Sequence, residues 1–189
     1  MRPPKVEDQQ LLEGLMGVLR SKGYDGASLN DLASSSGLKK ASLYHRFPGG
    51  KKEIAGAVLQ YVSEWIDSHI KQILFNKDLP PAERLGKAIQ NIDALYDRGN
   101  EICIIRALSM DTGITLFAEQ LKQGTTQWIE SFKSLGLDMG FTEAEAQKKA
   151  LQVIINVQGG LVVSKAMGDN APFEHALKGI LEMYQLKEV

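Results

Sequence analysis

The sequence predicts an all-α fold, and two observations lead to this prediction. Apolar residues recur at helical spacing over most of the 189 residues, and no segment shows the sustained apolar-polar alternation of a half-buried strand. Caps and breakers divide this periodicity into about nine helices. The chain is long enough for a small module and a helical core, and its 43% apolar content excludes general disorder.

The first three expected helices end in a helix-turn-helix pattern. The first helix has Leu12, Leu15 and Leu19 as an inward stripe, and Gly23 is placed to end it. Ser28 is a good N-cap for the second helix, with Asp31 three residues later as its acidic partner. Gly37 tolerates the left-handed backbone that closes this helix, and a short third helix follows.

The later helices are expected from their breakers and caps. The Pro80-Pro81 pair separates a long helix from the next one, and Thr142 forms a capping box with Glu145. We expect Gly136 and Gly140 to stop the seventh helix and Asn170 to cap the last one. The nine expected ranges are 6–22, 28–36, 40–47, 51–76, 81–98, 101–110, 114–135, 142–167 and 170–186.

The formal charge is unevenly distributed along the chain. Residues 1–52 contain nine Lys and Arg against five Asp and Glu, a net charge of +4, although the whole chain carries −1. Residues 53–189 carry the opposite balance, −5. The positive charge therefore coincides with the helix-turn-helix, as expected of a nucleic-acid-binding surface.

The third helix is rich in hydrogen-bond donors on the side opposite its apolar positions Ala41, Leu43 and Phe47. A lysine pair then opens the fourth helix, where free backbone N–H groups and the helix dipole favour a phosphate. The candidate DNA-contacting residues are Ser28, Lys39, Lys40, Ser42, Tyr44, His45, Arg46, Lys51 and Lys52. Tyr44 and the lysine pair suit phosphates, while Lys40, Ser42 and His45 are candidates for base edges.

The run Leu43-Tyr44-His45-Arg46-Phe47 resembles the end of the recognition helix in TetR-family transcriptional regulators. The continuation Pro48-Gly49-Gly50-Lys51 is similar to the LmrA/YxaF-like subgroup of that family. Two positions depart from the family pattern. Lys39 stands where a serine or threonine N-cap is frequent, and Arg46 stands where histidine is common.

The resemblance implies a DNA-binding domain over residues 1–50 and a helical effector-binding and dimerisation domain over residues 51–189. It implies a cytoplasmic homodimer, paired through its last two helices, that represses transcription. Such a protein binds a palindromic operator in double-stranded DNA and is released by a small hydrophobic or aromatic effector. A regulator of the same fold that activates, or that binds DNA without a ligand, stays open as an alternative.

The eighth expected helix bears on assembly. Between Ala150 and Met167 its apolar residues fall on all sides, so the helix must be covered on all sides. Gly159 and Gly160 in its interior favour the close approach of another backbone or of a ligand. We expect a partner subunit on one face; the alternative is that the last helix of the same chain covers it entirely.

Aromatic, sulfur-containing and amide side chains of the later helices are candidates for an effector pocket. Amides inside an apolar run need partners when they are buried, and a ligand can supply them. The candidates are Trp65, Tyr96, Cys103, Met110, Phe117, Trp128, Asn156 and Gln158. For any one of them an ordinary place in the core is the competing interpretation.

Several other functions are not supported by the sequence. One cysteine and three scattered histidines provide neither an intrachain disulfide nor a zinc cluster. No nucleophile is joined to a base by a motif, so an all-helical small-molecule enzyme is the least favoured alternative, and we expect no catalysis, cofactor or metal. The residues MRPPKVEDQQ lack an apolar signal core, and polar residues interrupt the stretch 151–167, so we expect no membrane span.

Overall fold

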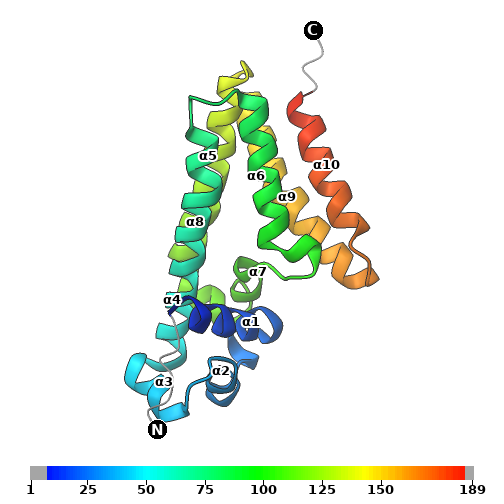
Figure 1. The fold of residues 1–189 in the computed structure, drawn as a ribbon. Coiled ribbons are helices and arrows are strands. Elements are labelled where there is room, and N and C mark those ends of the chain that lie inside the picture. Colours follow the sequence, from blue (N-terminus) through cyan, green and yellow to red (C-terminus); the bar gives the residue numbers. More distant parts are fainter. Residues whose placement is uncertain (1–7, 186–189) are drawn as a thin grey trace. The chain divides into compact units, whose positions relative to one another are not determined.

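The computed structural model describes residues 8–185, in which all regular structure is helical (Figure 1). The α-helices are α1 (Asp8–Gly26), α2 (Leu29–Ser35), α3 (Lys40–Arg46), α4 (Gly50–Ile66), α5 (Gln72–Phe75), α6 (Pro81–Leu95), α7 (Ile104–Leu108), α8 (Asp111–Asp138), α9 (Glu143–Met167) and α10 (Ala171–Gln185). A π-helical segment, η1 (Asp67–Lys71), joins α4 to α5, and a 3₁₀ segment, η2 (Asp97–Gly99), follows α6. The all-α prediction is confirmed. The expected helix ends at residues 6 and 186 lie outside the described residues.

The described residues form two compact units. The first contains residues 8–63 and 104–121, and the second contains residues 64–103 and 122–185. Helices α7 and the start of α8 therefore belong with the N-terminal helices, which local sequence patterns did not indicate. The expected division of function at residue 50 remains a prediction.

The first unit is built around α1, which packs against α2 and α7. Its buried stripe is Leu11, Leu15 and Leu19, all fully buried, whereas Leu12 is only half-buried. The expected stripe was therefore wrong at its first position, because the buried residues follow a strict spacing of four. Gly14 lies where the two helix backbones come closest: a Cβ there would be 2.4 Å from the carbonyl oxygen of Ser35.

The second unit is held together mainly by α9 and α10, which share the most extensive contact of any two elements. Gly160 makes their close approach possible, because a Cβ at this position would lie 2.9 Å from the Cβ of Ala176. The buried Tyr184 hydroxyl donates to the carbonyl oxygen of Phe132 at 3.1 Å, which ties α10 to α8. The predicted Thr142–Glu145 capping box is present at the start of α9.

Two helix boundaries and one side-chain cap differ from the expectations. Gly136 does not stop the seventh helix: it lies inside α8, where a Cβ would lie 3.0 Å from the Cβ of Ala146. Gly140, the second expected stop, provides the left-handed turn after α8. Asn170 does not cap α10 with its side chain, which donates to Asn100. The sixth expected helix is shorter than expected: α7 covers only Ile104–Leu108, and Asp111 after it has a left-handed φ of +48°.

The capping of α10 comes from other side chains. The Ser164 hydroxyl accepts from the Phe173 N–H at 3.0 Å, and the Asp169 carboxylate accepts from the Ala171 N–H at 3.0 Å. The π-helical segment was also not expected. Within it, the Ser68 hydroxyl donates to the carbonyl oxygen of Glu64 at 2.7 Å, and the Asn91 amide donates to that of His69 at 2.6 Å. Side chains thus satisfy carbonyl groups around the widened turn.

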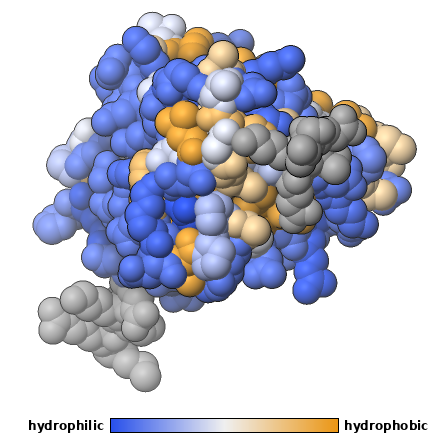
Figure 2. All heavy atoms as spheres, turned by 90° about the horizontal axis from the view of Figure 1, so that it is seen from above, coloured by the Kyte–Doolittle hydropathy of each residue, from blue (hydrophilic) through white to orange (hydrophobic). Residues whose placement is uncertain are grey.

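Helix α9 is long and apolar enough to cross a membrane by length and composition, contrary to the expectation that no segment fits. A core helix of a globular protein passes the same criterion, so one such helix is weak support for a span. Seen from above, the surface is mostly hydrophilic, with an apolar band across it (Figure 2).

Two glycines of α1 provide a matched test of the packing. Gly14→Ala is expected to lower the free energy of unfolding by about 1 to 3 kcal/mol, because the added methyl group overlaps the backbone of α2. Gly17→Ala meets no atom within 4 Å and is expected to raise it by up to about 1 kcal/mol through helix propensity. Urea unfolding followed by circular dichroism measures both changes. Equal stabilities for the two variants would contradict the close approach at Gly14.

Candidate nucleic-acid interface

A capping box fixes the start of α2, as the sequence predicts. The Ser28 hydroxyl oxygen accepts from the Asp31 N–H at 3.1 Å, and the Asp31 carboxylate accepts from the Ser28 N–H at 3.1 Å. The Lys22 ammonium group lies 2.7 Å from the same carboxylate. Lys22 and then Ser28 lower the pKa of Asp31 to about 2, so this carboxylate is ionised near neutral pH. Ser28 is exposed, and its hydroxyl is engaged in the cap.

The turn between α2 and α3 depends on Gly37 and on the buried Ser36. Gly37 adopts a φ of +67°, as expected for the end of α2. The Ser36 hydroxyl donates to the carbonyl oxygen of Ala33 at 2.9 Å and accepts from the Leu38 N–H at 3.3 Å. Sequence reasoning did not identify Ser36, because its role depends on its burial.

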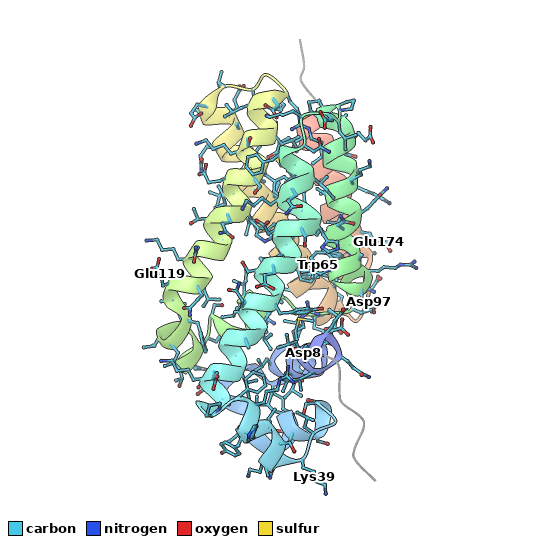
Figure 3. All side chains as sticks on the ribbon, turned by 60° about the vertical axis from the view of Figure 1, so that its left-hand side comes forward. Asp8, Lys39, Trp65, Asp97, Glu119 and Glu174 are labelled. Atoms are coloured by element: carbon cyan, nitrogen blue, oxygen red, sulfur yellow. The ribbon has the colours of Figure 1, made fainter. Side chains whose placement is uncertain are left out.

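Helix α3 is attached by two apolar side chains, Leu43 and Phe47, which are both buried. Ala41, expected to share their face, is exposed instead. Lys39 occupies the N-cap position without a side-chain cap, as predicted, and its side chain points away from the helices (Figure 3). The other side chains of α3 are exposed, which leaves its polar face open to a partner.

Most of the predicted DNA-contacting side chains in and around α3 and at the start of α4 lack a polar partner among the described residues. Within residues 8–185, no hydrogen bond or ion pair engages the side chains of Lys39, Lys40, Ser42, Tyr44, His45 or Lys52. All six are exposed. Their donors are therefore available to phosphate oxygens and base edges.

Arg46 differs from its neighbours because it is paired. One of its guanidinium nitrogens lies 2.5 Å from the Asp8 carboxylate at the start of α1. Both side chains are partly exposed, so the pair is accessible to competing anions. Asp8 was not predicted, because it is 38 positions from Arg46 in the sequence.

The loop between α3 and α4 ends at Gly50, which has a φ of +65° and donates its N–H to the carbonyl oxygen of Phe47 at 2.9 Å. A Cβ at Gly50 would lie 4.0 Å from the Tyr44 ring. The Glu53 carboxylate accepts from the Gly49 N–H at 2.6 Å. A carboxylate of the protein therefore already occupies part of the expected anion site at the start of α4.

The two lysines of α4 have different environments. Lys52 is exposed, whereas Lys51 is half-buried, with its ammonium nitrogen 4.6 Å from the centroid of the Tyr24 ring. The same nitrogen lies 3.4 Å from the carbonyl oxygen of Asp25. The predicted lysine pair thus consists of one free donor and one that the protein holds in place.

The predicted effector-binding residues are divided between the two units: Met110 and Phe117 belong to the first and the other six to the second. Phe117, Tyr96, Cys103 and Trp128 are buried, whereas Met110 is 58% exposed. The Tyr96 hydroxyl donates to the Cys103 sulfur at 3.3 Å.

The three remaining candidates for the effector pocket are half-buried. Trp65 stacks on His69 with ring centroids 4.4 Å apart. The Asn156 amide oxygen accepts from Gln152 at 2.8 Å, so a side chain of α9 already supplies one partner. Gln158 is half-buried as well. The buried indole N–H of Trp128, in contrast, has no hydrogen-bond partner among residues 8–185.

A groove runs between α9 and α10, with Ile155, Gly159 and Val163 on one side and Pro172 and His175 on the other. Several apolar side chains of α9 are at least 40% exposed in the single chain: Leu151, Ile155, Val162, Val163 and Met167. The expectation that α9 has one face beyond the reach of its own chain agrees with this exposure.

Comparison with known proteins shows similarity to one family of regulators. Residues 11–58 match the bacterial regulatory proteins of the tetR family. The chain is 24% identical to the uncharacterised HTH-type transcriptional regulator YxaF of Bacillus subtilis, over 87% of each chain. It is 22% identical to the HTH-type transcriptional regulator LmrA of the same organism, over 88% of this chain and 90% of LmrA. A structure of the TetR-family regulator CifR, a cysteine mutant in complex with 26-base-pair operator DNA, covers 99% of this chain and 100% of CifR, with a TM-score of 0.75 and 19% identity.

Proposed function

Because this chain belongs to the TetR family of transcriptional regulators, in the subgroup of YxaF and LmrA, we propose that it is a ligand-responsive repressor. In this proposal a cytoplasmic homodimer binds a palindromic operator, and a small hydrophobic or aromatic effector releases it. The observation that carries the proposal is the polar face of α3, whose exposed donors have no polar side-chain partner within residues 8–185, apart from the paired Arg46, while Leu43 and Phe47 are buried. The CifR complex with operator DNA supports DNA binding by this fold.

On DNA, the side chains of α3 have two kinds of task. Phosphate contacts by Tyr44, Lys51 and Lys52 fix the position of the helix, and contacts by Lys40, Ser42 and His45 read base edges. Two copies of α3 about 34 Å apart read successive major grooves, so a dimer doubles the contribution of one short helix.

Salt dependence tests the phosphate contacts. Lys52→Ala is expected to weaken binding to a duplex that the protein selects from a random-sequence pool. It should also flatten the slope of log affinity against log salt by about one unit per half-site, because one counterion fewer is released. Fluorescence anisotropy across a salt series measures both effects.

Lys122→Ala is the matched control, because Lys122 is an exposed lysine of α8 in the second unit. This variant is expected to keep the wild-type affinity and slope. Identical salt slopes for Lys52→Ala and the wild type would remove Lys52 from the DNA interface. Failure of the wild type to select any duplex would overturn the proposed function itself.

The exposed apolar stripe of α9 supports dimerisation through α9 and α10. Leu151, Ile155 and Val162 fall on one side of the helix, because they are spaced at i, i+4 and i+11. Each is more than 40% exposed in the single chain. A contiguous apolar surface of this kind favours a partner of the same composition, and a second copy provides one.

Val162→Arg tests this interface. Because Val162 is exposed in the single chain, arginine at this position should leave the fold intact but place a charge in the dimer contact. The variant is expected to elute as a folded monomer and to lose operator affinity, since the second half-site no longer adds to binding. Light scattering and circular dichroism measure mass and helicity. Thr126→Arg on the exposed surface of α8 is the control, and a dimeric Val162→Arg would place the interface elsewhere.

Trp128 is the effector contact that we propose on the strongest physical grounds. A buried N–H without a partner has lost its water without gaining a hydrogen bond, and an acceptor atom of a ligand would satisfy it. An effector can shift the protein between DNA-bound and released conformers only by its differential affinity for them, typically about 1 to 3 kcal/mol.

Trp128→Phe keeps an aromatic ring while removing the N–H. With a panel of planar aromatic compounds, we expect effectors to quench Trp128 fluorescence and to release DNA over the same concentration range. Trp65→Phe leaves Trp128 as the only tryptophan, which makes the quenching specific. Trp128→Phe should raise the effector concentration needed for release without changing operator affinity. An unchanged release midpoint would exclude Trp128 as an effector contact, and the absence of any effector would favour a ligand-independent regulator.

A further inference from the structure

We infer that Tyr24 and Asp25 are positioning residues for Lys51 and that they make its phosphate contact depend on the start of α8. The inference rests on the proposed DNA-binding function. It concerns contacts within the first unit, to which all of these residues belong.

The Lys51 ammonium group is held on one side by the protein. Its nitrogen lies over the Tyr24 ring, 4.6 Å from the centroid, and 3.4 Å from the Asp25 carbonyl oxygen. An ammonium group has three donors, so these contacts leave donors for a phosphate oxygen. A lysine that is already held loses less conformational freedom on binding DNA than the exposed Lys52 does.

The two residues that hold Lys51 are themselves held by the segment around the start of α8. The Asp25 carboxylate accepts from the Thr112 N–H at 3.0 Å. The ring of Tyr24 meets Phe117 edge-to-face, with centroids 5.6 Å apart. These contacts place Tyr24 and Asp25 between the DNA-facing lysine and the start of α8.

The backbone of this segment is irregular where it meets Tyr24 and Asp25. Asp111 has a φ of +48°, which is uncommon for a non-glycine residue. Phe117 interrupts α8 with a φ of −122°. Irregular backbone of this kind is suited to two alternative conformations. A change in this segment would move the Asp25 side chain and the Tyr24 ring, and with them the Lys51 ammonium group.

Helix α8 also carries Trp128, the proposed effector contact, in its part that belongs to the second unit. An effector that alters α8 would therefore change how well Lys51 is positioned. By thermodynamic reciprocity, DNA binding must alter the start of α8 in turn. This reciprocal effect can be measured without knowing the effector.

The test compares two substitutions of Asp25. Asp25→Asn removes the charge but keeps an acceptor for the Thr112 N–H, whereas Asp25→Ala removes both. Both variants gain DNA affinity in general because they lose a negative charge. This gain cancels when the DNA affinities of the two variants are compared with each other. On a duplex selected by the wild type from a random-sequence pool, Asp25→Ala is expected to bind about 3- to 10-fold more weakly than Asp25→Asn, the range of one hydrogen bond.

The two Asp25 variants are also compared in proteins that carry Lys51→Ala or Lys52→Ala. This comparison distinguishes an effect on the position of Lys51 from a general loss of stability. With Lys51→Ala the difference between the Asp25 variants should vanish, since no positioned ammonium group remains. With Lys52→Ala as the control it should persist in full. An equal difference in both backgrounds would overturn the inference, because Asp25 would then act only on the stability of the unit. Circular dichroism melting checks that all variants are folded.

Hydrogen exchange provides an independent readout. DNA is expected to slow exchange of the Thr112 amide in the wild type and in Asp25→Asn, but not in Lys51→Ala. Unchanged exchange at Thr112 in the wild type bound to DNA would also overturn the coupling. Wild-type affinity for DNA in Lys51→Ala would overturn the inference while leaving the proposed function intact. A wild type that selects no duplex would overturn both.

Discussion

The presentation of α3 depends on how a seven-residue helix is kept in place. A helix this short is not stable on its own, and α3 buries only Leu43 and Phe47 against its unit. Its position is therefore set by the elements on either side. Gly37 turns the chain before it and Gly50 turns the chain after it, both in left-handed conformations that other residues rarely adopt. Because two apolar contacts and two turns hold α3, its other side chains are exposed to a partner, although Arg46 is paired with Asp8.

The features that sequence reasoning predicted are those decided by neighbouring residues. The Ser28–Asp31 and Thr142–Glu145 capping boxes and the turn at Gly37 involve residues at most three positions apart or a single backbone angle. The features that it missed depend on residues distant in sequence. The Asp8–Arg46 pair and the inclusion of residues 104–121 in the first unit follow from packing, which periodicity alone does not reveal. Gly136 shows the same limit: its lack of a side chain serves contact with Ala146 rather than a helix end.

Gly159 and Gly160 of α9 differ in whether packing within the single chain requires a glycine. A glycine inside a helix costs about 1 kcal/mol relative to alanine, so each of the two calls for a reason. Gly160 has one within the chain, because α10 approaches so closely that a Cβ would meet Ala176. Gly159 has none, since a Cβ there would meet no atom within 4 Å, and it lines the groove between α9 and α10. No atom of residues 8–185 therefore requires a glycine at this position, whereas a partner subunit in the proposed dimer would supply a close neighbour.

The proposed DNA-facing surface contains carboxylates as well as cations, and this combination has a consequence for recognition. Asp8 holds Arg46, and Glu53 accepts from the Gly49 N–H where a phosphate would otherwise bind. A phosphate that approaches either place must compete with a carboxylate of the protein, so part of its attraction is cancelled. Random phosphate contacts gain little from such sites, whereas a duplex that also satisfies the unpartnered donors of α3 gains from base contacts as well. In the proposed complex, the paired carboxylates thus lower the phosphate contribution for every duplex, so tight binding depends on the base contacts that only a matching site adds.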